Sequence, residues 1–282
     1  MAISAADVKN LREKTGAGMM ECKNALVQCD GDFAGAEKLL KERGLAAVEK
    51  RSGRAANEGK IFIKIGGDTA VLAELATETD FVARNPEFIA LGGAIVEKAL
   101  EKGYTEPSEE LTGMVTGLAA KIRENMSLKR VRVLKASPGE YLTQYIHGDG
   151  AIGVVVKMAA DKPEVFQKEE ARAFAFNIAL HIAAFNPMAL DRTKIDQAWL
   201  KEQEGIFRVQ MEQDEKMQGK PANVIDNILK GKVNKFLQDI CLMEQGYVKD
   251  EKLTVTKALE ECGKQMGAKL SIADYVYLKV GA

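Results

Sequence analysis

The sequence predicts an α+β protein assembled from several small parts. Apolar residues recur every three to four positions through residues 1–45, which is typical of helices, and then alternate in residues 60–65, which is typical of a strand. A Gly-Gly-Asp turn at 66–68 separates this strand from an apolar run at 69–75 and predicts a hairpin. Helical signals then return. These changes of period indicate helices that cover small antiparallel sheets.

Residues 1–48 predict a three-helix domain of the ubiquitin-associated (UBA-like) kind. Ser4 and Asp7 have a capping-box spacing at the start of the first helix, and a second helix is expected over 20–29. The third is expected to begin at Asp32 and to end at Gly44, because glycine is common just after the last residue of a helix. Residues 49–59 lack an apolar stripe and predict a linker.

Residues 60–137 predict the first half of a core. After the hairpin, Asn85 is expected to cap a helix that has Pro86 at its first position. A further helix is expected over 108–125, and a strand over 128–134.

An internal repeat predicts that the core is duplicated. Residues 65–71, Ile-Gly-Gly-Asp-Thr-Ala-Val, return at 146–152 as Ile-His-Gly-Asp-Gly-Ala-Ile, and each copy leads into an apolar strand and then a Pro-Glu pair that opens a helix. Chance similarity between two Gly-rich turns is the alternative. The second half is expected over 138–187 and 241–282, with its last strand at 268–280.

Residues 188–240 predict an inserted antiparallel helical hairpin. A charged helix is expected over 194–218 and a second one after a Gly-Lys-Pro turn at 219–221. Trp199 is expected to pack between the two helices.

Composition argues against several classes of function. Forty basic side chains against forty-one acidic ones leave a formal charge of −1, which disfavours a protein whose main task is direct nucleic-acid binding. Four cysteines without a CxxC pair and two histidines predict reduced thiols in a cytosolic, cytoplasmic protein, with no metal site and no cofactor. No segment reads as a signal peptide or a membrane span, and no phosphate loop or nucleophile motif indicates an active site.

The segment 74–84, Glu-Leu-Ala-Thr-Glu-Thr-Asp-Phe-Val-Ala-Arg, is the strongest candidate for a binding site. It leaves an apolar strand and places Phe81 beside Asp80 in polar surroundings, between Thr79 and Val82. Phe81 could instead pack under the following helix, and Asp80 could simply satisfy backbone donors of the loop.

A second candidate surface lies in the amino-terminal helices. Met19 and Met20 are adjacent, so both cannot face inward on a helix, and methionine suits adaptable contacts. With Val8 and Lys9 they predict a surface for a partner helix. His147 lies at a turn, where a structural role is as plausible as a contact, and His181 is expected to be a satisfied helix histidine.

Three motifs resemble those of the elongation factor Ts family. They are residues 11–26, Leu-Arg-Glu-Lys-Thr-Gly-Ala-Gly-Met-Met-Glu-Cys-Lys-Asn-Ala-Leu, the segment 74–84, and residues 145–148, Tyr-Ile-His-Gly. Ala76 stands where the family usually has Asn, and Arg123 follows Ile122 where some relatives have Gly. By this resemblance we also expect the additional carboxy-terminal helical module of some relatives to be absent.

The resemblance implies a guanine-nucleotide exchange factor rather than an enzyme. It implies binding to the GDP form of elongation factor Tu and to its nucleotide-free form, with the loop at Thr79, Asp80, Phe81 and Val82 displacing Mg²⁺. It also implies further contacts through the amino-terminal domain and the core, and possible self-association through the hairpin. We place these contacts at six residues: Val8, Lys9, Met19, Met20, Ile122 and His147. A UBA-like adaptor and a ribosome- or RNA-associated scaffold are the alternatives.

Overall fold

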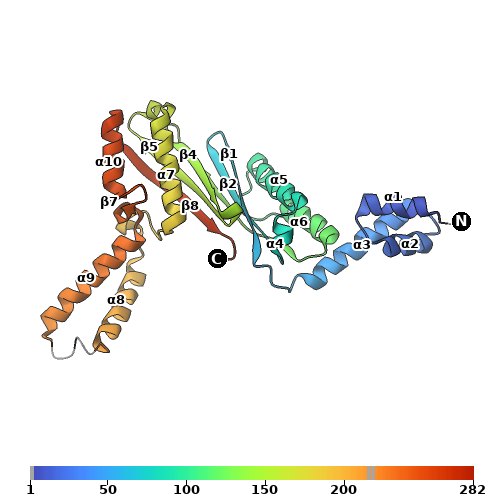
Figure 1. Cartoon of the computed structure of the whole chain (residues 1–282), viewed down its shortest axis with the longest axis horizontal. Coiled ribbons are helices and arrows are strands. Elements are labelled where there is room, and N and C mark those ends of the chain that lie inside the picture. The colour runs from blue at the N-terminus through green and yellow to red at the C-terminus, as the bar shows by residue number, and fades with distance from the viewer. Residues whose placement is uncertain (1–2, 215–216, 218–219) are drawn as a thin grey trace. The chain divides into compact units, whose positions relative to one another are not determined.

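The computed structural model describes residues 3–214, 217 and 220–282, which form two compact units (Figure 1). Unit 1 comprises Met1–Val133, Ile146–Gly153 and Leu278–Ala282, and unit 2 comprises Leu134–Tyr145 and Val154–Tyr277. The predicted α+β class is confirmed, because each unit combines helices with a small sheet. The predicted five-part division of the chain stays a prediction. Among the described residues, no helix is both long and apolar enough to cross a membrane.

Unit 1 begins with three packed helices, α1 (Ala5–Thr15), α2 (Met19–Gln28) and α3 (Phe33–Arg51). The predicted capping box is confirmed, because the Asp7 N–H donates to Ser4 Oγ at 3.1 Å and the Ser4 N–H donates to Asp7 Oδ2 at 3.1 Å. Gly16 ends α1 in the left-handed conformation, with φ of 70°. The shared core contains Leu11, Cys22 and Leu26. Likeness to UBA domains stays a prediction.

The predicted end of the third helix at Gly44 is wrong. Helix α3 continues through Gly44 to Arg51, so it takes up the start of the predicted linker, and β1 begins at Glu58. Gly44 serves close packing instead, because a Cβ there would lie 3.2 Å from Ala120 Cβ on α6 (Glu109–Ile122). A glycine that brings two helices together looks the same in sequence as a glycine that ends one.

The first sheet has the strand order β1–β2–β3, with β1 (Glu58–Gly66), β2 (Thr69–Thr77) and β3 (Met126–Lys135). The predicted hairpin is confirmed: β1 and β2 are antiparallel and close at the pair Gly66↔Thr69. Helix α6 and α5 (Pro86–Lys102) contribute to the core of this unit. Strand β2 lies between its two neighbours and is buried almost throughout, which makes it a rigid base for the residues that follow.

The far end of the chain returns to unit 1 and meets a buried carboxylate. Glu74 on β2 is 3% exposed and accepts from Arg130 Nε at 2.5 Å and from the Gly281 N–H at 2.9 Å. Arg130 also donates to the Lys279 carbonyl at 2.6 Å. Removal of a charge from water is costly unless partners replace the water, so these contacts hold the end of the chain against β2.

The second sheet has the strand order β4–β5–β8. Its strands are β4 (Tyr141–His147), β5 (Ile152–Ala160) and β8 (Leu270–Lys279). Helix α7 (Glu169–Phe185) packs against α10 (Val255–Met266). Between α9 and α10 the chain adds a short turn η5 (Leu242–Glu244) and two paired strands, β6 (Gly246–Tyr247) and β7 (Asp250–Thr254).

The two copies of the repeat share one backbone feature. Gly67 joins β1 to β2 and Gly148 lies between β4 and β5, and both have φ of 60°. The duplication was expected to include the start of the following helix, and here the copies differ. Pro86 begins α5 as predicted, capped by Asn85, whereas Pro163 begins a 3-10 turn, η2 (Pro163–Gln167), before α7 starts at Glu169.

The inserted hairpin consists of α8 (Gln197–Glu212) and α9 (Ala222–Ile240), preceded by a turn η3 (Arg192–Lys194). The first helix is therefore shorter than predicted, and the predicted turn at 219–221 includes Gly219, which lies outside the described residues. Trp199 packs in the hairpin as predicted, with its ring 5.9 Å from that of Phe236.

Candidate functional site

The candidate loop is a single turn of helix rather than an open loop. Strand β2 ends at Thr77, and α4 (Asp80–Ala83) follows, capped by Thr79, whose hydroxyl accepts from the Val82 N–H at 3.4 Å. Threonine is a good helix cap because its short side chain reaches the free backbone donors of the first turn. The sequence prediction of a loop at Asp80 and Phe81 is corrected accordingly.

Phe81 projects from this turn into solvent, with 82% of its surface exposed. The next two residues point the other way: Val82 and Ala83 are 8% and 5% exposed and belong to the core under α5. Full burial of a phenylalanine stabilises a fold by about 1.5–3 kcal/mol, and the exposed Phe81 ring does not contribute this stabilisation. Asp80 is half-buried and pairs with Arg84 at 3.3 Å, one helical turn away.

Glu124 holds the turn in place, and the sequence interpretation missed it. One carboxylate oxygen accepts from Thr79 Oγ1 at 2.8 Å, and the other accepts from Thr77 Oγ1 at 2.9 Å and from the Thr79 N–H at 3.1 Å. Hydrogen bonds to an ionised acceptor are the stronger kind. Their partners lie 45 to 47 residues away in sequence, so no local pattern revealed them.

A second clamp lies next to Glu124. The Asn125 N–H donates to Glu78 Oε1 at 2.6 Å, and Asn125 Nδ2 donates to the Arg54 carbonyl at 2.6 Å. Arg54 in turn pairs with Glu78 at 3.5 Å. The start of α4 is therefore fixed on both sides by the segment that follows α6, and Phe81 stands on a rigid base.

The other predicted contact residues differ in exposure. Met19 and Met20 are both exposed, at 47% and 64%, and Lys9 is exposed and pairs loosely with Glu13 at 3.8 Å. Val8 was expected at the surface, and this is wrong: it is 8% exposed, because its side chain packs in the core between the three helices. Val8 can therefore support a contact surface at Met19 and Met20 only through the core of the three helices.

One of the predicted contacts, Ile122, lies close in sequence to the residues that fix the Phe81 turn. Ile122 is half-buried at the end of α6, two residues before Glu124. Arg123, between them, pairs with Glu21, which lies in the same first turn of α2 as Met19 and Met20. The segment 122–125 therefore connects the methionine surface to the Phe81 turn within unit 1.

Arg123 has a backbone conformation that favours glycine. Its φ is 68°, in the left-handed region at the end of α6, where a side chain other than that of glycine costs roughly 1–2 kcal/mol. The Gly18 N–H first, and the Arg123 guanidinium in addition, hold the pKa of Glu21 below its usual value. The arginine therefore joins α2 to the end of α6, a contact that glycine could not make.

His147 is exposed and precedes the short turn η1 (Gly148–Gly150). The turn is fixed to β1 by Lys60, which pairs with Asp149 Oδ2 at 2.6 Å and donates to the Asp149 carbonyl at 2.7 Å. Lys60 first, and more weakly Arg84, lower the pKa of Asp149. His147 and the Phe81 turn thus belong to the same compact unit.

His181 is a satisfied structural histidine, as predicted. It is completely buried, Nδ1 accepts from the Val248 N–H at 3.2 Å, and Nε2 lies 3.0 Å from Gln245 Oε1. These partners require the neutral ring with its proton on Nε2, and burial lowers its pKa.

The cysteines of unit 2 are poor nucleophiles. Burial raises the pKa of Cys262 to about 11 and also raises the pKa of Cys241, so both remain thiols at neutral pH. Within the described residues, no group of three or more His, Cys, Asp or Glu side chains is placed to hold a metal ion.

Comparison with known proteins identifies the family. The family model described as "Elongation factor TS" matches residues 78–282. Elongation factor Ts of Treponema denticola is 48% identical over 281 residues, covering 100% of this chain and 99% of that protein. The chain belongs to the elongation factor Ts family. Other family members are elongation factor Ts of Treponema pallidum, 44% identical over 100% of this chain and 99% of the relative, and that of Clostridium acetobutylicum, 39% identical over 99% and 92%.

Membership of the elongation factor Ts family indicates a translation elongation factor and protein biosynthesis as its process. The family model begins at residue 78, so it includes Thr79, Phe81 and Glu124 and leaves out α1–α3. The relatives align along the whole chain and therefore include those helices as well.

Proposed function

We propose that this protein is a guanine-nucleotide exchange factor that acts in the cytoplasm on elongation factor Tu. It binds the GDP form of that GTPase, displaces Mg²⁺ and promotes the release of GDP, and it has no active site of its own. The observation that carries the proposal is Phe81, 82% exposed on a turn that Thr79 and Glu124 hold in place. An exposed ring on a fixed support loses little conformational freedom when it enters a partner.

The magnitude of the effect shows what Phe81 can contribute. Exchange is a linkage effect in which the factor and the nucleotide weaken each other's binding equally. A shift of about 10⁴ in an equilibrium requires roughly 5.5 kcal/mol of differential binding, whereas burial of one phenylalanine supplies about 1.5–3 kcal/mol. Loss of Mg²⁺ from the diphosphate and contacts around the ring must supply the remainder.

The additional contacts that we propose surround the turn in unit 1. Met19, Met20 and Lys9 offer an exposed surface on the amino-terminal helices, and Ile122 and His147 extend the contact on the core. Asp80 would orient the turn through its pair with Arg84, while Val82 and Val8 support the surface from the core.

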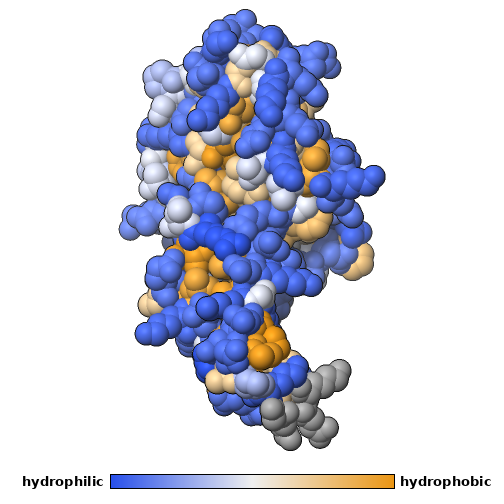
Figure 2. Space-filling model, turned by 90° about the vertical axis from the view of Figure 1, so that its left-hand side faces the viewer, coloured by the Kyte–Doolittle hydropathy of each residue, from blue (hydrophilic) through white to orange (hydrophobic). Residues whose placement is uncertain are grey.

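Self-association through the hairpin is the second part of the proposal. Its helices carry exposed apolar side chains at Ile206, Val209 and Val224. Figure 2 shows a largely hydrophilic face on which apolar side chains gather in separate patches. Sedimentation of the purified chain tests this part, and a monomer at all concentrations would refute it.

Release of fluorescent GDP from elongation factor Tu, followed by stopped flow, tests the exchange reaction. Phe81→Ala should slow factor-stimulated release by roughly 10- to 100-fold, the equivalent of the burial energy of the ring. Phe176→Ala is the matched control, because Phe176 is also exposed, at 42%, but lies in unit 2. Wild-type acceleration by Phe81→Ala would refute the proposed site. Salt-sensitive binding to RNA without any effect on GDP release would favour the scaffold alternative, and capture of a regulatory helix would favour the adaptor.

A further inference from the structure

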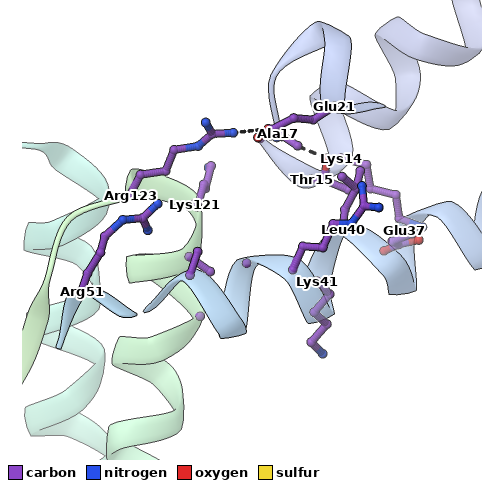
Figure 3. Close-up of a pocket in the computed structure, with 16 residues that line it drawn as sticks. Lys14, Thr15, Ala17, Glu21, Glu37, Leu40, Lys41, Arg51, Lys121 and Arg123 are labelled. Carbon is purple, nitrogen blue, oxygen red and sulfur yellow. Dashed lines mark hydrogen bonds and ion pairs between the residues drawn. The ribbon is translucent and has the colours of Figure 1, made fainter. Parts of the chain in front are cut away.

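Unit 1 contains a cavity of about 340 Å³ between the turn after α1, the middle of α3 and the end of α6 (Figure 3). It is hollow because small residues line its walls: Gly16, Ala17, Gly44, Ala47, Gly117 and Ala120. A Cβ built on Gly117 would meet no atom within 4 Å, so this wall faces open space. The volume is within the range of small-molecule sites in proteins.

The cavity has a strong excess of positive charge. Two carboxylates, Glu21 and Glu37, line it together with six cations: Lys14, Lys41, Arg43, Arg51, Lys121 and Arg123. Of the six, Lys14 pairs with Glu37 at 2.6 Å and Arg123 with Glu21. Lys121 pairs with Glu87, which does not line the cavity, at 2.7 Å.

The other three cations have no carboxylate within ion-pair distance in the part of the chain that the structure describes. Arg43 donates to a neutral acceptor, Gln28 Oε1, at 2.5 Å. Arg51 is the least satisfied of them, because its Nη1 is buried without any hydrogen-bond partner among the described residues. Figure 3 shows its side chain reaching toward the same space as those of Lys121 and Arg123.

A buried guanidinium nitrogen without a partner indicates a missing anion. Burial of a charged donor is unfavourable unless an acceptor replaces its water, and nearly all such groups in proteins are satisfied. The planar guanidinium matches the oxygens of phosphate in geometry, and its hydrogen bonds to phosphate are of the strong, charge-assisted kind. A ligand with several negative charges would balance the excess of cations better than a monovalent ion would.

We propose that this cavity binds a diphosphate or triphosphate group, either as free polyphosphate or as part of a nucleotide. The walls belong to the amino-terminal helices and to α6, so the bound group would contact both. The site is separate from the Phe81 turn and does not depend on the exchange reaction.

Isothermal titration calorimetry of the whole chain with inorganic tripolyphosphate tests the site. We expect saturable binding that weakens as salt rises. Arg51→Gln should weaken it about tenfold or more, as expected for loss of hydrogen bonds to a charged group. Gly117→Gln should weaken it as well, because the added side chain occupies the cavity without a change of charge. Lys50→Gln is the control, since Lys50 is an exposed cation next to Arg51 that does not line the cavity.

Competition separates the sources of the phosphate group. GDP or GTP that binds more tightly than tripolyphosphate, with the same loss in Arg51→Gln, assigns the site to a nucleotide, and equal or weaker binding assigns it to free polyphosphate. Circular dichroism confirms that each variant is folded. No saturable binding by the folded wild type, or an equal loss in Lys50→Gln, would overturn the proposal. So would an RNA oligonucleotide that binds through Arg51 when tripolyphosphate does not.

Discussion

Two aromatic residues occupy comparable turns in the two sheets and have opposite surroundings. In both sheets a hairpin is followed by a short helical turn and then by a long helix: α4 and α5 after β2, and η2 and α7 after β5. Phe81 in the first turn is 82% exposed, whereas Phe166 in the second is 6% exposed. The Phe166 ring stacks on Tyr141 with centroids 5.2 Å apart. In α4 the residues Val82 and Ala83 fill the core instead, which leaves the aromatic free.

The difference teaches how a repeated unit can acquire a binding surface. The turn in unit 2 closes its own core, and Arg172 Nε fixes it by donating to the Phe166 carbonyl at 2.6 Å. The turn in unit 1 is fixed by Glu124 through side chains and one backbone N–H, so none of its rigidity depends on burial of the aromatic. In unit 1, therefore, Glu124 supports the turn and Phe81 remains available for contact with a partner.

The largest expected effect comes from truncation of the two aromatics in parallel. Phe166→Ala should destabilise unit 2 by about 3–5 kcal/mol, because it leaves a cavity in a packed core. Phe81→Ala should change the stability of unit 1 by less than about 0.5 kcal/mol, as is usual at the surface. Urea unfolding followed by Trp199 fluorescence reports on unit 2, and hydrogen exchange of β2 reports on unit 1. Equal losses in the two variants would contradict the comparison.

Removal of Glu124 should have the next largest effect. Glu124→Ala leaves the buried Thr77 hydroxyl and the Thr79 N–H without their acceptor, at a cost of about 1–3 kcal/mol. We expect slower GDP release although Phe81 is intact, with partial recovery in Glu124→Gln, which keeps one acceptor oxygen. Arg172→Ala, which removes the corresponding support in unit 2, is the control and should leave release unchanged. Normal release by folded Glu124→Ala would show that the turn needs no such support.

The two histidines allow the units to be distinguished by pH. His181 belongs to unit 2 and His147 to unit 1. Burial lowers the pKa of His181 below its usual value of 6.5, so the unfolded ring takes up a proton at a higher pH than the folded one. Stability of unit 2 should therefore fall as the pH drops below 6.5, by at most about 1.4 kcal/mol per pH unit. Trp199 fluorescence during urea unfolding measures this slope. His181→Gln should reduce it and His147→Gln should not; the reverse would refute the assignment.

The smallest expected effect is that of Arg123→Gly. Glycine relieves the left-handed backbone at φ of 68° by roughly 1 kcal/mol, and the lost pair with Glu21, half exposed on both sides, is worth about 0–1 kcal/mol. We expect a small net stabilisation of unit 1, measured by thermal unfolding. A loss above about 1 kcal/mol would mean that the contact between α2 and the end of α6 is stronger than a surface ion pair.

Local patterns predicted the elements of this fold better than its contacts. The Ser4 capping box, the Gly66–Gly67 hairpin and the Asn85–Pro86 helix start were predictable because each is set by neighbours in sequence. The end of α3 was not, because Gly44 packs against Ala120, which is distant in sequence.

The candidate site shows the same limit. Phe81 could be picked out from sequence because its neighbours are polar, but Glu124 could not, because a surface glutamate has no sequence signature for acceptors on another element. Val8 was placed on a contact surface although it is buried, because exposed and buried apolar positions in a short helix differ by only part of a turn.

The return of residues 279–281 to Glu74 has a consequence for synthesis of the chain. Glu74 and Arg130 belong to unit 1, but the Gly281 N–H lies 207 residues after Glu74 and the Lys279 carbonyl lies 149 residues after Arg130, so both are synthesised after unit 2. A nascent chain that stops near residue 270 would hold Glu74 and Arg130 without the Gly281 N–H and the Lys279 carbonyl. Maturation of the first unit thus waits for the completion of the second.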